Sequence, residues 1–107
     1  MDKLDSTQIE QLRAIGAYLY EIRQDQARSL EEIAAKTYIP LRLLKALEAG
    51  QEQILPEPVF IQGFIRRYGD VLGLDGTALS QQFPIHQAVP AVPETNTREF
   101  ADSPQPS

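Results

Sequence analysis

Apolar residues in the first part of the chain recur at steps of three and four, which is the spacing of one face of an α-helix. The first such run lies between Thr7 and Gln26 and comprises Ile9, Leu12, Ile15, Leu19 and Ile22. Thr7 followed by Glu10 is typical of a capping box and predicts the start of this helix. Gly16 lies close to the apolar face, where the missing side chain would allow a second helix to approach closely.

Two shorter helices are predicted next. Ser29 and Glu32 form a second capping-box pattern in front of a helix from Leu30 to about Lys36. Pro40 is predicted to occupy the first position of the following helix, where its missing N–H costs nothing, and Gly50 to end it. A long helix followed by two short helices and a tight turn is the pattern of a helix-turn-helix.

Two further helices follow. The fourth is predicted from about Val59 to Leu72, with Gly73 as its stop, and Leu55 is expected to reach the core from the preceding loop. A fifth, short helix is capped by Asp75 or Thr77. Its inward residues are Leu79 and Phe83. The pattern therefore predicts an all-α domain of five helices.

The fourth helix carries more apolar surface than one side of a small core requires. On a helical wheel, Phe60 and Phe64 lie at one edge of its apolar arc, beside Gly63 and Arg67. An aromatic pair flanked by arginine at the edge of a core is one form that a docking surface takes. The alternative is that both rings belong to the ordinary core, and the pattern alone favours this alternative.

Composition changes near residue 84. Five of the eight prolines lie in residues 84–107, a segment that holds few large apolar side chains. We therefore expect a folded domain over residues 6–83 and a disordered, acidic, proline-rich tail or linker over residues 84–107.

The charge argues against a general nucleic-acid-binding role. The net charge is −5 and the isoelectric point is about 4.8, so the overall field repels a polyanion. In the second helix of the motif only Arg42 and Lys45 would reach a base or a phosphate. Glu31 stands beside Glu32 where a phosphate would pass. A DNA-binding regulator that uses Arg42 and Lys45 is therefore kept as the alternative function.

Catalytic and metal-binding signatures are missing from the sequence. There is no cysteine, and the one histidine, His86, falls in the predicted tail. No nucleophile–base pair, phosphate-binding glycine loop or metal-ligand spacing is present. We expect no catalytic residue, no metal and no cofactor, and hence no enzyme. The absence of a signal sequence and of a long apolar run favours a cytoplasmic location.

The chain resembles the Cro/phage-repressor class of helix-turn-helix in the spacing of residues 29–50. Over roughly residues 15–83 it resembles the cytoplasmic N-terminal domain of the RodZ family of bacterial cell-shape proteins. The most specific block is Gly63–Tyr68. The other matching segments are Leu30–Ala34, Ile39–Pro40, Leu44–Gly50, Leu55–Pro56, Val59–Gln62 and Leu72–Asp75.

The RodZ resemblance implies a function. Proteins of that family use this domain to bind the actin-like filament protein MreB, through the helix after the motif and its neighbouring surface. Phe60, Phe64 and Arg67 are the implied partner-binding residues. A membrane would be reached only through a segment that this chain lacks, which implies an inner-membrane-tethered location if the chain is a fragment of a longer RodZ-like protein. A relative without a membrane anchor is the other possibility.

Overall fold

The computed structural model describes residues 4–85, which form five α-helices and no strand. The helices are α1 (Ser6–Asp25), α2 (Leu30–Thr37), α3 (Leu41–Ala49), α4 (Pro58–Val71) and α5 (Gly76–Ser80). The predicted all-α, five-helix class is confirmed. Most of the predicted disordered tail, with His86, lies outside the described residues, and the proposed domain limits stay a prediction.

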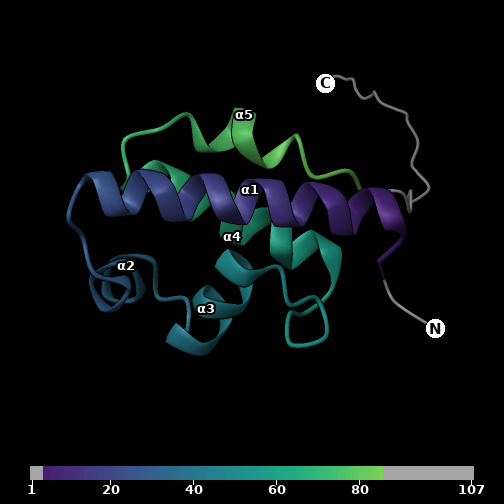
Figure 1. The fold of residues 1–107 in the computed structure, drawn as a ribbon, viewed down its shortest axis with the longest axis horizontal. Helices are drawn as coiled ribbons and strands as arrows, with labels where there is room; N and C mark the ends of the chain where they lie inside the picture. The colour runs from purple at the N-terminus through teal and green to yellow at the C-terminus, as the bar shows by residue number, and fades with distance from the viewer. Residues whose placement is uncertain (1–3, 86–107) are drawn as a thin grey trace, which may run out of the picture.

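The five helices surround one core. α1 runs along the length of the molecule, with α5 along one side of it, α2 and α3 on the other, and α4 behind it (Figure 1). α5 packs mainly on α4, α1 mainly on α3, and α2 on both α3 and α4. The largest fully buried side chains come from α1 to α4 and from segments that join or follow the helices: Leu12, Ile15, Leu19, Ile33, Ile39, Leu44, Leu47, Leu55, Ile61, Ile65, Tyr68 and Phe83.

The start of α1 differs from the prediction. The capping box is formed by Asp5 and Gln8: the Asp5 carboxylate accepts a hydrogen bond from the Gln8 backbone N–H at 2.8 Å, and the Gln8 side-chain oxygen accepts one from the Asp5 N–H at 3.1 Å. The prediction of Thr7 with Glu10 is therefore wrong. Leu4 is buried and anchors the chain just before the cap, so the helix begins earlier than the apolar repeat indicates.

The start of α3 is also displaced by one residue. Pro40 is the N-cap and not the first helical residue, because its ψ of 139° is extended. Its carbonyl already accepts hydrogen bonds from the N–H groups of Leu43 and Leu44, at 2.9 and 3.1 Å. Pro40 therefore initiates α3 from outside the helix, through its carbonyl.

The predicted caps at Ser29, Gly50, Gly73 and Asp75 are confirmed. Ser29 accepts a hydrogen bond from the N–H of Glu32 at 3.0 Å, and Asp75, in place of Thr77, caps α5. Gly50 and Gly73 have φ values of 68° and 84°, a left-handed conformation that glycine adopts without steric cost.

The predicted close approach at Gly16 is confirmed. A Cβ atom added there would lie 2.2 Å from the backbone oxygen of Leu47. Since this oxygen belongs to the backbone of α3, it cannot move aside as a side chain would. Gly16 therefore sets how closely α1 and α3 pack.

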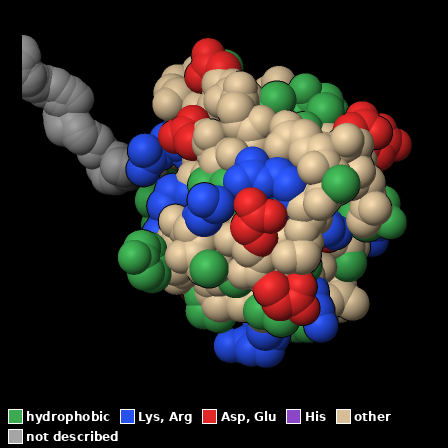
Figure 2. All heavy atoms as spheres, turned by 90° about the vertical axis from the view of Figure 1, so that its left-hand side faces the viewer, with side chains coloured by type: hydrophobic (Ala, Val, Ile, Leu, Met, Phe, Trp, Pro, Cys, Tyr) green, Lys and Arg blue, Asp and Glu red, His purple; other side chains and the backbone are tan. Residues whose placement is uncertain are grey.

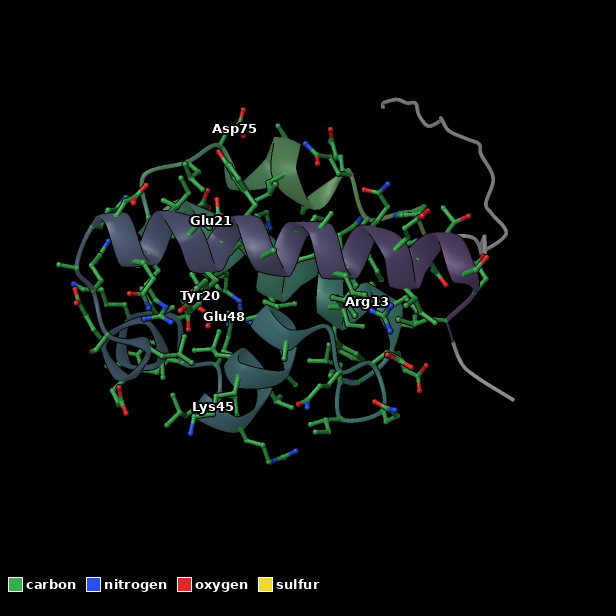
Figure 3. The ribbon with its side chains drawn as sticks, in the orientation of Figure 1. Arg13, Tyr20, Glu21, Lys45, Glu48 and Asp75 are labelled. Carbon is green, nitrogen blue, oxygen red and sulfur yellow. The ribbon has the colours of Figure 1, made fainter. Side chains whose placement is uncertain are left out.

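A polar cluster that the sequence did not indicate joins three helices. Arg23 of α1 binds both carboxylate oxygens of Glu48 of α3, at 2.8 and 3.1 Å, and also donates to the backbone oxygen of Arg28 at 2.9 Å. The hydroxyl of Tyr68 in α4 donates to the same carboxylate. Figure 3 shows Glu48 between α1 and α3. Burial, followed by the hydrogen bond to Glu48, raises the pKa of Tyr68 above its ordinary value.

Candidate protein-docking surface

The sequence-predicted partner residues lie along one side of α4. Phe60, Phe64 and Arg67 follow one another at i, i+4 and i+7, so the helix brings them onto a common face, with Gly63 beside them. We call these four residues the α4 edge. Their exposure differs: Phe60 is 56% exposed, whereas Phe64 is only 9% exposed.

Arg67 covers the ring of Phe64. Its guanidinium carbon lies 5.7 Å from the ring centroid, within cation–π range. The same guanidinium donates a hydrogen bond to the backbone oxygen of Thr37 at 3.0 Å, at the end of α2. The structure therefore separates the predicted aromatic pair: Phe60 is largely exposed, while Phe64 belongs to the core and has the Arg67 guanidinium over its ring.

The exposed apolar surface extends before Phe60 in the chain. Val59 is 58% exposed and Ile54, in the loop before α4, is 41% exposed. Sequence reasoning did not select either residue. The exposure of Val59 could have been predicted, because this apolar residue falls outside the apolar arc of the helical wheel. Exposed large apolar side chains gathered within seven residues are a feature of interaction sites.

Gly63 has no role in packing within the described domain. A Cβ atom added there would meet nothing within 4 Å. Glycine in the interior of a helix costs about 1 kcal/mol relative to alanine. No packing contact within residues 4–85 explains this cost, and the space beside Gly63 on the α4 edge is open.

The DNA-binding residues of the alternative function lie on α3. Arg42 and Lys45 are both exposed. On α2, Glu31 is exposed and Glu32 pairs with Arg28 at 3.0 Å. Figure 2, which shows the end of the molecule that lies on the left in Figure 1, has acidic side chains among the basic ones and no uninterrupted basic face. The end of the molecule seen in Figure 2 therefore lacks the single-sign field of a typical DNA-binding surface.

Residues 4–85 hold neither a candidate metal-binding cluster nor a candidate membrane span. No group of three or more His, Cys, Asp or Glu side chains in this range is arranged to hold a metal ion. None of its helices combines the length and the apolar character that crossing a membrane requires.

Comparison with known proteins places residues 18–79 in a family described as a helix-turn-helix domain. The chain is 36% identical over 63 residues to the cytoskeleton protein RodZ of Streptococcus pneumoniae, which covers 59% of the chain and 23% of that protein. It is 37% identical over 54 residues to the uncharacterized membrane protein YmfM of Bacillus subtilis, which covers 50% of the chain and 19% of that protein. The matches thus span less than a quarter of each relative. No solved structure matches the chain significantly.

Proposed function

The chain belongs to the helix-turn-helix domain family and is RodZ-like within it, and we propose that it is the interaction domain of a cell-shape protein that binds an actin-like filament protein of the MreB type. In this proposal the α4 edge contacts the filament. The helix-turn-helix formed by α2 and α3 holds α4 in place, through the packing of α2 on α4 and the hydrogen bond from Arg67 to Thr37. The role is binding and not catalysis.

The observation that carries the proposal is the exposure of Phe60. Phe60 is 56% exposed although Ile61, the next residue, is fully buried. A folded domain gains little from an aromatic ring left in water, whereas the same ring enclosed by a partner is the usual anchor of an interface. Exposed Val59 beside it and the vacant space above Gly63 enlarge the area that a partner would cover.

A location at a membrane is also proposed. One of the two relatives is named a membrane protein, while residues 4–85 hold no helix that could cross a membrane. We therefore propose that a part of the protein outside these residues attaches the domain to the membrane. The docking surface on α4 would then link a filament to that membrane.

Co-sedimentation tests the filament contact. The chain is mixed with filaments of the MreB-type protein from the same organism and centrifuged, and the bound fraction is measured against chain concentration. Saturable pelleting that depends on the filament is expected. If the chain stays in the supernatant at concentrations of about 100 μM, equivalent to a free energy of binding weaker than about −5.5 kcal/mol, the proposal fails.

The DNA-binding alternative keeps one supporting observation. Arg42 and Lys45 are exposed on the second helix of the motif, the element that enters the major groove in DNA-binding proteins of this kind. A band-shift titration with genomic fragments at physiological salt distinguishes the two functions. A specific complex that is lost in the variant with Arg42→Ala and Lys45→Ala would favour the alternative.

A further inference from the structure

A groove of about 420 Å³ lies between α1 and α5, away from the α4 edge. None of the four α4-edge residues lines it. The lining residues are Ala14, Ile15, Tyr18, Leu74, Asp75, Ala78, Leu79 and Gln82. Its floor is apolar, because Ile15 and Leu79 are core residues that are 2% and 8% exposed.

The groove follows from how the helices pack. α5 makes its main contacts with α4, and α1 makes its main contacts with α3, so α1 and α5 are held by different partners. Figure 1 shows α5 running beside α1 on the side opposite α2 and α3. The space between the two helices is bordered by Tyr18, whose side chain is 44% exposed. A half-exposed tyrosine beside an apolar floor is typical of a protein-binding surface.

The border of the groove is acidic. Ala14, Tyr18, Glu21 and Asp25 stand at i, i+4, i+7 and i+11, so the wall that α1 contributes continues into two exposed carboxylates. Asp75 lines the groove from the start of α5. Figure 3 shows Glu21 and Asp75 on the same side of α1, toward α5. No lysine or arginine is among the groove's described lining residues.

We propose that this groove binds a basic amphipathic helix of a partner protein. A groove between two helices with an apolar floor accepts a third helix, whose apolar residues at i, i+3, i+4 and i+7 fill it. Lysine or arginine side chains flanking that stripe lie against Glu21, Asp25 and Asp75. The charge pattern selects a cationic helix, because an acidic one would face three like charges.

The test uses the full chain and a defined probe. The probe is a fluorescein-labelled, 14-residue amphipathic peptide of leucine and lysine. Binding is measured by fluorescence anisotropy, and the site is located by amide chemical shifts of the labelled chain. The expected result is a saturable complex, with the largest shifts at Ala14, Tyr18, Leu74 and Leu79.

Matched variants separate specific docking from general attraction between charges. Glu21→Gln with Asp75→Asn removes two charges from the border and retains a side chain that can cap α5. We expect this variant to bind the peptide about fivefold more weakly, which is the effect of losing two exposed ion pairs. Glu31→Gln with Glu57→Gln removes the same charge from exposed positions that do not line the groove, and is expected to leave the affinity unchanged. Ala78→Phe fills the groove and is expected to abolish binding, with circular dichroism confirming the fold.

Several results would overturn the proposal. Equal losses of affinity in the two double charge variants would show that the peptide is attracted by the overall negative charge of the chain and not by the groove. Absence of binding, or shifts centred on Val59 and Phe60, would show that the groove does not take a cationic helix. Nuclear Overhauser contacts from residues after 85 to the Tyr18 ring in the free chain would show that the chain itself occupies the groove. Shifts at Tyr18 that depend on chain concentration without peptide would identify a second copy as the occupant.

Discussion

Arg67 lies over the ring of Phe64, with its guanidinium carbon 5.7 Å from the ring centroid, and joins this ring to the end of α2 through the hydrogen bond to Thr37. Phe64 is consequently enclosed by its own domain, whereas Phe60, one turn earlier, is open to solvent. The two phenylalanines lie on the same side of α4, but one is part of the core and the other is exposed. Single substitutions therefore distinguish their roles.

Phe60→Ala is expected to weaken filament binding without destabilising the domain. The ring is 56% exposed, so its removal leaves no cavity, whereas the loss of an aromatic anchor from an interface costs about 2 kcal/mol or more. Co-sedimentation gives the affinity and thermal unfolding gives the stability. Tyr18→Ala is the matched control, since this half-exposed aromatic ring lies on α1, in a hollow that no α4-edge residue lines. Unchanged binding by Phe60→Ala would contradict the proposed contact.

Phe64→Ala is expected to destabilise the domain itself. Truncation of a buried phenylalanine costs about 3–5 kcal/mol, and the position of Phe64 at the margin of the core places the effect at the lower end of this range. Urea unfolding followed by circular dichroism measures it. A loss below about 1 kcal/mol would show that the ring is not part of the core. Binding losses in this variant are interpretable only where the domain remains folded.

Gly63→Ala is expected to stabilise the domain and to weaken filament binding. The added methyl group meets nothing within 4 Å inside the fold, and alanine is favoured over glycine in a helix by about 1 kcal/mol. A partner backbone that approaches Gly63 closely would be displaced by the methyl group. Thermal unfolding and co-sedimentation are measured on the same sample. Increased stability with unaltered affinity would show that Gly63 is not part of the filament contact. It would not contradict the proposed role of Phe60.

Arg23→Met is expected to destabilise the domain by about 3–5 kcal/mol, because it leaves the Glu48 carboxylate without its cation. Both side chains of this ion pair are 10% exposed, so water compensates little. The variant with Arg23→Met and Glu48→Gln should lose less than the sum of the two single variants. A double-mutant cycle by urea unfolding measures this coupling. Strict additivity would mean that the pair contributes no interaction energy.

The buried Tyr68 predicts a loss of stability at high pH. Its pKa is raised by burial and by the hydrogen bond to Glu48, so the folded state keeps a proton that the unfolded state releases. This stabilisation is complete below the unfolded pKa of about 10 and is lost as pH rises toward the folded pKa. The free energy of unfolding of the natural chain should therefore fall more steeply between about pH 9 and about pH 11 than that of Tyr68→Phe. Parallel pH profiles would contradict this assignment.

Much of the fold follows from local sequence signals. Ser29, Gly50, Gly73 and Asp75 end or begin helices where predicted, because a cap depends on hydrogen bonds to backbone groups only three or four residues away. The two shifted starts have the same local origin: Asp5 with Gln8 provides a complete capping box, and Pro40 acts through its carbonyl. The sequence offers more than one capping pattern near each of these starts, and it does not show which one the folded chain uses.

Residues that meet only after folding could not be paired in advance. Arg23, Glu48 and Tyr68 come from three helices, and nothing in their separate surroundings indicates that one carboxylate joins them. The groove beside Tyr18 likewise exists because α1 and α5 pack on different helices.

The α4 edge shows both contributions. Helical periodicity by itself placed Phe60, Phe64 and Arg67 on one side of α4, since that depends only on 3.6 residues per turn. Which ring is exposed was decided by the tertiary structure, because exposure depends on what other helices place against each turn. The end of α2 lies within reach of Arg67, which lies over Phe64, while Phe60 stays more than half exposed among the described residues.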